Sequence, residues 1–210
     1  MPTFARARIQ PMSTPRGAAT RARIIEAAAA LVAARGVGGT TLDEVMEISR
    51  TSKSQIYHYF ADKDALIAAV VKTQSQTVLD FQSGCLSKVD SLQGLRQWRD
   101  RLVELNRRKR GAGGCPMGSL ASELADRSEP ARTLLDKSFK EWESHIATAL
   151  ETMQELRVLS RRAPPRDLAI ALVSALQGGL LLAQTSRSTR PLELALDMAI
   201  DHIASYALRP

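Results

Sequence analysis

Five polar and aromatic side chains within a stretch of six residues could contact a nucleic acid, and they are Lys53, Ser54, Gln55, Tyr57 and His58. On a helix, where neighbouring residues are roughly 100° apart, Ser54, Tyr57 and His58 point away from Ile56 and Phe60. Unpaired backbone N–H groups in the first turn of a helix favour phosphate, and side chains there can reach base edges in a major groove. The pattern therefore indicates hydrogen bonding to DNA.

Two short helices are predicted to position these residues. Thr41 followed by Glu44 forms a capping box that begins a helix over 42–49, and Ser52 can cap a second helix that runs through about Phe60. Helices of this length joined by about three residues have the proportions of a helix-turn-helix. A solvated helix with capping residues is the alternative on local grounds alone.

The whole chain is predicted to be helical. Aromatic residues make up only 4% of the sequence, and β-branched and aromatic residues never alternate with polar ones over a useful length. A helix over 17–35 precedes the short pair, and a fourth helix runs from Asp62 to about Phe81. Gly, Pro, Ser or Asp bound the later helices, which are expected at 90–109, 116–125, 129–156, 165–186 and 191–208. The expected fold is all-α with about nine helices.

Three parts are expected along the chain. Residues 1–19 contain three arginines and no acidic residue, which is typical of a flexible basic arm. Residues 20–66 would form a three-helix helix-turn-helix domain. Residues 67–210 would form a C-terminal helical bundle that dimerises.

Charge and composition narrow the class of protein further. Lys plus Arg number 29 and Asp plus Glu 22, so the formal net charge of +7 favours a polyanionic partner. The 2 cysteines match neither a disulfide framework nor a zinc spacing, and neither a metal nor a cofactor is expected. No secretory signal is recognisable, so a cytoplasmic location is expected. Residues 168–186 carry no charge, but their polar residues favour a buried helix over a membrane span.

The segment from Thr41 to Leu66 resembles the DNA-binding signature of TetR/AcrR-family transcriptional regulators. Its most specific piece is Tyr57-His58-Tyr59-Phe60, followed at close spacing by Lys63 and Leu66. The resemblance implies that Thr41 and Lys63 hold phosphates at the flanks, and that Ile56 and Phe60 are core. It also implies that the residues facing the groove are Lys53, Ser54, Gln55, Tyr57 and His58.

The turn between the two short helices departs from that family pattern. Where the family usually has Ala-Gly-Val-Ser, this chain has Ser49-Arg50-Thr51-Ser52. A non-glycine residue in a left-handed helix terminus costs about 1 kcal/mol. Either the turn is rearranged, or Arg50 is tolerated there for a phosphate contact. We include both Arg50 and Ser52 among the predicted DNA contacts.

A second resemblance covers the C-terminal bundle. The segments 114–124, 177–179 and 182–184 are similar to the LmrA/YxaF-like branch of the family. That branch implies a pocket in the helical core for a small apolar or aromatic effector. Large apolar residues and a few polar ones suit such a wall, and the candidates are Trp98, Cys115, Met117, Leu120, Trp142, His145, Met153, Gln177 and Leu181. Each of them could instead be plain core, and Cys115 could be a redox or electrophile sensor or a small packing residue.

Apolar stripes on the last two helices predict a homodimer. One helix-turn-helix contacts too few base pairs to select an operator, so two recognition helices are needed. The predicted interface residues are Leu172, Val173, Leu176, Gly179, Leu180, Ala183, Leu196 and Ile200. The alternative is that these stripes fill the core of a single protomer.

Together these features predict a ligand-responsive repressor that binds a palindromic operator as a dimer and is released by a small effector. The alternative function is a small-molecule carrier or enzyme on the same helical bundle without DNA binding. No Ser/His/Asp set, carboxylate pair, phosphate loop or metal cluster supports catalysis, so an enzyme is not expected.

Overall fold

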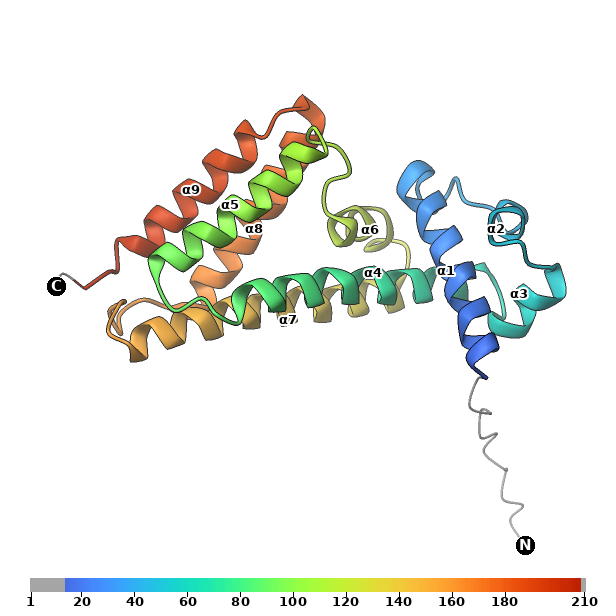
Figure 1. Cartoon of the computed structure of the whole chain (residues 1–210), viewed down its shortest axis with the longest axis horizontal. Coiled ribbons are helices and arrows are strands. Elements are labelled where there is room, and N and C mark those ends of the chain that lie inside the picture. Colours follow the sequence, from blue (N-terminus) through green and yellow to red (C-terminus); the bar gives the residue numbers. More distant parts are fainter. Residues whose placement is uncertain (1–13, 209–210) are drawn as a thin grey trace, which may run out of the picture. The chain divides into compact units, whose positions relative to one another are not determined.

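The computed structural model describes residues 14–208 and contains nine helices within that range (Figure 1). The helices are α1 (Pro15–Arg35), α2 (Leu42–Ser49), α3 (Lys53–Tyr59), α4 (Lys63–Leu86), α5 (Leu92–Arg108), α6 (Pro116–Leu124), α7 (Glu129–Glu155), α8 (Pro165–Ser186) and α9 (Arg190–Ala204). The chain divides into two compact units, Met1–Val70 and Val71–Pro210. The prediction of an all-α fold with about nine helices is confirmed.

The first unit has its own apolar core. α1 packs against α2, and α2 packs against α3. Ile24 on α1, Val45 on α2 and Ile56 on α3 are all buried in this core, which Phe60 and Leu66 complete. Because each short helix contributes a buried side chain, the three helices hold one another in place.

Helix α1 starts earlier than predicted. Thr14 caps it by accepting a hydrogen bond from the Gly17 N–H at 3.2 Å, and Pro15 occupies the first helical position. Proline is favoured there because its missing N–H would have no partner in the first turn anyway. The last residues of the predicted basic arm thus belong to α1, and residues 1–13 of that arm lie outside the described range.

Helix α4 extends to Leu86, beyond the predicted end near Phe81. Gly84 lies inside the helix, close to its end. Leu86 is buried, and its burial favours continuation of the helix to that point.

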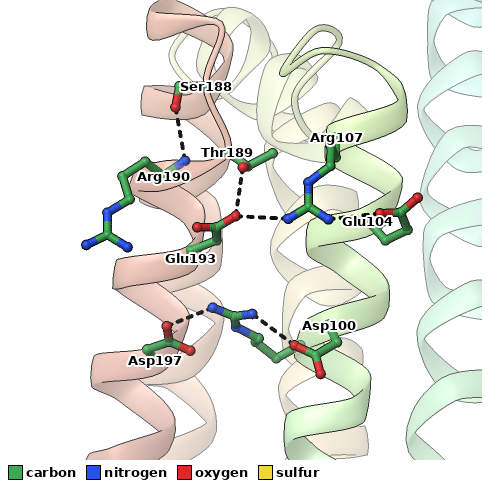
Figure 2. Close-up of polar contacts among 9 residues, drawn as sticks. Asp100, Glu104, Arg107, Ser188, Thr189, Arg190, Glu193 and Asp197 are labelled. Atoms are coloured by element: carbon green, nitrogen blue, oxygen red, sulfur yellow. Dashed lines mark hydrogen bonds and ion pairs between the residues drawn. The ribbon is translucent and has the colours of Figure 1, made fainter.

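In the second unit α8 packs against both α7 and α9, α5 packs against α9, and α6 packs against α7. Ion pairs join α5 to α9 (Figure 2). Arg99 Nη2 lies 2.7 Å from Asp197 Oδ2, and Arg107 Nη2 lies 3.3 Å from Glu193 Oε1. Arg107 and Arg108 also pair with Glu104, so both arginines that end α5 have acidic partners within their own unit.

The last helix ends at Ala204 rather than near Leu208 as predicted. Beyond it the chain turns and pairs with the segment that follows α7. The Ser160 N–H donates to the Tyr206 carbonyl at 2.8 Å, and the Leu208 N–H donates to the Val158 carbonyl at 3.1 Å. Backbone groups of Tyr206 and Leu208 are thus paired with this segment rather than within a longer helix.

Helix α8 is the one helix of the described range that is long and apolar enough to cross a membrane. It packs between α7 and α9, and Leu172, Leu176 and Ala183 are fully buried there. The core helix of a helical bundle shows the same composition.

Four non-glycine residues of the described range have a left-handed backbone, and all are arginines: Arg50, Arg110, Arg157 and Arg187. Each lies just after a helix, where a left-handed residue commonly ends the helical hydrogen-bond ladder. Glycine is the usual residue at such a site, because its missing Cβ removes the steric penalty.

Candidate nucleic-acid interface and bundle cavity

Helix α2 begins with the predicted capping box. The Glu44 N–H donates to Thr41 Oγ1, and the Thr41 N–H donates to Glu44 Oε2, both at 3.3 Å. The Thr41 hydroxyl also donates to that carboxylate at 2.8 Å, and Arg35 of α1 forms an ion pair with it. The Thr41 hydrogen bond and the Arg35 charge together lower the pKa of Glu44. The cap fixes where α2 starts and ties it to α1.

The turn after α2 keeps a left-handed residue although it contains no glycine. Arg50 has φ 52° and ψ 48°, and its N–H donates to the Glu47 and Met46 carbonyls. Ser49 and Thr51 on either side of it are buried. The turn is therefore not rearranged, and the phosphate contact for which Arg50 would be tolerated there stays a prediction. Arg50 itself is exposed.

Helix α3 is fixed at its start by a second capping box. The Gln55 N–H donates to Ser52 Oγ at 3.3 Å, and the Ser52 N–H donates to Gln55 Oε1 at 2.8 Å. Sequence reasoning placed the Gln55 side chain in the groove, but its carbonyl oxygen is already used within the helix. The Gln55 amide nitrogen is the part of this side chain that can still reach a partner.

The outward face of α3 is exposed as predicted. Ser54 and His58 are exposed, and 48% of Tyr57 is accessible. On the opposite face Ile56 and Phe60 are buried in the core of the first unit. Lys53 is also exposed, in the first turn of the helix. Ser54, Tyr57 and His58 are thus presented on one side of a helix whose other side is anchored.

The two predicted phosphate contacts lie at helix starts. Thr41 caps α2 and is exposed, and Lys63 is the first residue of α4 and is half-buried. Asp62 precedes Lys63, and its carboxylate accepts a hydrogen bond from the Ala65 N–H at 2.7 Å. This cap stabilises the start of α4 and therefore the position of Lys63.

The second unit contains a cavity of about 300 Å³. It lies among α4, α5, α7 and α8 and the segment between α5 and α6, and its lining residues are Thr77, Val78, Phe81, Gln82, Leu102, Leu105, Asn106, Lys109, Ala112, Gly114, Cys115, Pro116, Trp142, Leu176 and Leu180. This volume is at the small end of ligand pockets, and a mostly apolar wall with a few polar groups is typical of them.

The predicted effector residues fall into separate groups. Cys115 and Trp142 line this cavity. Gln177 and Leu181 line a neighbouring cavity of about 260 Å³, which Cys115 shares. His145 lies beside a third cavity of about 530 Å³. The other four predicted residues are buried side chains that line none of these cavities, and they are Trp98, Met117, Leu120 and Met153.

Sequence reasoning missed the two buried polar residues of the cavity wall. Gln82 on α4 and Asn106 on α5 are both buried. A signal for Asn106 was present, because it continues the spacing of Leu95, Trp98 and Leu102 along the apolar face of α5. A polar residue on such a face needs a partner inside the protein.

The residues that carried the second resemblance meet in space. The Gln177 side chain lies against α6, where its Nε2 is 3.5 Å from Cys115 Sγ. A Cβ added to Gly118 would stand 2.6 Å from Gln177 Oε1. A larger residue at 118 would therefore displace the glutamine, which explains why glycine and glutamine occur together here.

The predicted dimer residues lie mainly inside the protomer. Leu172, Val173, Leu176, Ala183, Leu196 and Ile200 are buried core side chains, Gly179 is buried as well, and Leu180 is half-buried beside the cavity. Gly179 faces α9 of its own chain, since an added Cβ would be 2.9 Å from the Leu192 Cα. The apolar residues that α8 and α9 expose are instead Ile170, Leu181, Leu182, Leu194 and Met198.

A capped recognition helix on a three-helix core, followed by a separate helical bundle, defines a helix-turn-helix transcriptional regulator. A family model described as the C-terminal domain of LmrA/YxaF-like transcriptional regulators matches residues 91–198, and one for tetR-family bacterial regulatory proteins matches residues 24–70. The chain belongs to the TetR family of bacterial regulators, in its LmrA/YxaF-like group.

Similar proteins agree with this assignment. An uncharacterised HTH-type transcriptional regulator of Lactococcus lactis is 29% identical over 85% of this chain and 90% of its own length. The HTH-type transcriptional repressor NemR of Escherichia coli is 28% identical over 90% of this chain and 96% of its own length. A TetR-family regulator from Cytophaga hutchinsonii, 18% identical, has the same fold, with a TM-score of 0.81 over 95% of this chain and 100% of its own.

Proposed function

We propose that this TetR-family regulator is a cytoplasmic repressor that binds a palindromic operator as a homodimer and releases it when a small molecule occupies the bundle. The observation that carries the proposal is the exposed face of α3, on which Ser54, Tyr57 and His58 stand clear of the core. These side chains form an outward face on a helix whose opposite side is buried in the core of the first unit, so the whole face is free to contact a partner.

The exposed face of α3 would contact the bases, and residues that flank this face would contact the phosphates. Ser54, Tyr57 and His58 offer hydrogen-bond donors and acceptors for base edges in the major groove. Thr41, Arg50, Ser52, Lys53 and Lys63 would position the helix on the phosphates, a role that carries no sequence information directly.

Dimerisation follows from the need to read two half-sites. The spacing of recognition helices on a palindrome is about 34 Å or a multiple of it, which one protomer cannot supply. The exposed apolar side chains of α8 and α9 support an interface on these helices, with Leu181 at 63% and Met198 at 71% accessible. Gly178 lies beside Leu181 on the exposed side of α8, with nothing within 4 Å of its would-be side chain, and would permit close approach of a second copy.

Effector response is assigned to the cavity of about 300 Å³. Four of its lining residues, Thr77, Val78, Phe81 and Gln82, belong to α4, which begins with Lys63. A ligand that binds one arrangement of α4 better than another shifts the population of the two arrangements. Release of DNA would follow if the arrangement favoured by the ligand separates the two recognition helices differently.

A mobility-shift titration on the DNA that flanks the protein's own gene tests the regulatory role. We expect a sequence-preferring shift whose affinity falls steeply with salt. A variant with Ser54, Tyr57 and His58 all changed to Ala should lose at least about a hundredfold in specific affinity and keep its helical circular dichroism. No shift at any salt concentration would favour the carrier or enzyme alternative.

A further inference from the structure

The first unit carries an open groove on its surface, formed by α1 and the end of α2. Its volume is about 700 Å³, and its lining residues are Arg23, Glu26, Ala27, Ala30, Ile48, Ser49 and Arg50. The first four follow the spacing of a single face of α1. The other three end α2 and begin the turn after it. The groove is therefore distinct from the α3 face that is proposed to contact DNA.

Apolar surface in this groove is open to solvent. Ile48 is 54% accessible, although isoleucine is among the residues that are most often buried. On the α1 wall Ala30 is exposed and Ala27 is 5% accessible, so a helix placed in the groove would meet only small side chains there. A single exposed isoleucine is ordinary on a protein surface, and the charges of the groove have to identify the occupant.

The two charges of the α1 wall are complementary to a second copy of the same helix. Arg23 and Glu26 lie one turn apart and are both exposed. Neither side chain takes part in an ion pair or hydrogen bond with another described residue. When two copies of α1 lie antiparallel about a two-fold axis, Arg23 of each copy meets Glu26 of the other. The same favourable pairing then forms twice.

This register also brings small residues together along the rest of α1. If Arg23 faces Glu26 of the second copy, then Ala27 faces its Ala22 and Ala30 faces its Ala19. Ala19 and Ala22 are both exposed on α1. Small side chains allow helix axes to approach to about 8 Å, the short end of the usual range. Shape and charge thus favour the same arrangement.

We propose that this groove binds a second copy of the chain, with two antiparallel α1 helices paired through Arg23 and Glu26 and with Ile48 of each copy covered by the other. The contact is separate from the proposed α8–α9 interface, so it would join one dimer to the next. The groove has two positive side chains and one negative one, and this excess makes the contact weak in the free protein. On adjacent operators, a setting that rests on the proposed function, phosphates offset the excess charge and tethering raises the effective concentration.

Sedimentation equilibrium of the full-length protein tests the contact without DNA. At concentrations up to about a millimolar, the range of effective concentrations on a shared tether, the wild type should associate beyond its micromolar state. Glu26→Arg places arginine against arginine, and Arg23→Glu places glutamate against glutamate. Each should weaken this association by about tenfold or more. The double variant Arg23→Glu/Glu26→Arg restores opposite charges in exchanged positions and should recover the wild-type association.

A matched control separates the pairing from net charge. Glu47→Arg makes the same change of charge at an exposed residue of α2 that does not line the groove, and it should associate like the wild type. All these positions are exposed, so every variant should keep its helical circular dichroism. Absence of further association by the wild type, equal weakening by Glu47→Arg, or a double variant that does not recover would each overturn the proposal.

DNA binding by the same preparations distinguishes this inference from the proposed function. A duplex with two tandem copies of the DNA that flanks the protein's own gene, with spacings varied over one helical turn, should be bound cooperatively at one spacing. Glu26→Arg should lose this cooperativity and still bind the single-copy duplex. If the single copy is bound but the charge exchange changes neither association nor cooperativity, the regulator stands and the groove inference is wrong. If association follows the charge exchange while no DNA is bound, the groove inference stands and the regulatory role is wrong.

Discussion

The hydroxyl oxygens of Ser49 and Thr51 lie 2.7 Å apart and buried in the turn between α2 and α3. Ser49 Oγ also lies 2.6 Å from the Val45 carbonyl, to which it donates. The pair bridges Arg50, the left-handed residue of the turn. Side-chain hydrogen bonds thus stabilise a turn geometry that lacks the glycine usual at this position.

Replacing the left-handed arginine with glycine should stabilise the first unit. Arg50→Gly removes a steric cost of about 1 kcal/mol, so the midpoint of urea unfolding should rise. If Arg50 contacts a phosphate, the same variant should bind all DNA sequences more weakly. Arg157→Gly is the matched control, since Arg157 has φ 59° and lies in the second unit. It should stabilise the protein and leave DNA affinity unchanged, and a destabilised Arg50→Gly protein would contradict the steric argument.

Lys63→Ala should weaken DNA binding alike on all sequences. Loss of one phosphate contact reduces the slope of log affinity against log salt by about one. Fluorescence anisotropy with operator and unrelated duplexes over a range of salt concentrations measures both quantities. Lys137→Ala removes the same charge from an exposed position of α7 and should leave the slope as it is. An unchanged slope in Lys63→Ala would remove this residue from the phosphate contacts.

Met198→Glu should weaken the proposed dimer without unfolding the protomer. Met198 is 71% accessible in the single chain, so the substitution costs little there. Across a dimer interface it would bury a charge without a partner, and the dimer dissociation constant should rise by about a hundredfold or more. Sedimentation velocity at micromolar concentration measures the shift. Leu156→Glu, at a comparably exposed apolar position at the end of α7, is the control, and equal sedimentation of Met198→Glu and wild type would refute the interface.

Glu193→Gln should change the acid sensitivity of the second unit. Glu193 Oε1 accepts from the Thr189 hydroxyl at 2.8 Å and pairs with Arg107, and these contacts lower its pKa below the ordinary value of 4.5. Its contribution to stability is therefore present above pH 4.5 and is lost as the pH falls through the lowered value. Urea unfolding at a series of pH values measures the free energy of unfolding of both proteins. At neutral pH the value for the wild type should exceed that for the variant by about 1 kcal/mol or less. The difference should vanish in acid.

The control for this pH series is Asp201→Asn. The Arg96–Asp201 pair is 3.6 Å apart, and both side chains are mostly exposed, so its loss should change little at any pH. If the free energy of unfolding of Glu193→Gln lies below that of the wild type by the same amount at every pH, the contacts do not act through the charge of the Glu193 carboxylate.

The recognition helix could be predicted because its determinants are local. Ser52, Gln55 and the alternation of buried Ile56 with exposed Tyr57 lie within one short segment, and helix caps and faces follow directly from such spacing. The capping-box hydrogen bond of the Gln55 side chain was not predicted, and its contact in the groove stays a prediction that the amide nitrogen could still fulfil.

Features that depend on contacts between distant segments could not be predicted. The end of α9 is set by the pairing of Tyr206 with Ser160. No residue near the end of α9 indicates this pairing in the sequence. The apolar stripe of α8 indicates burial, but not whether the covering surface belongs to the same chain, and Leu172 and Leu176 are covered by their own protomer. The cavity depends in the same way on how α4, α5, α7 and α8 meet.

The four left-handed arginines at helix ends also bear on how this protein can change over time. Every arginine codon becomes a glycine codon by a single base change, and each such change would relieve the steric cost of a left-handed backbone. At Arg110, Arg157 and Arg187 the replacement touches neither the α3 face nor the side chains that line the cavity. A few single mutations should therefore raise the thermal stability of the protein. In a laboratory population selected at rising temperature, glycine should appear early at these three positions.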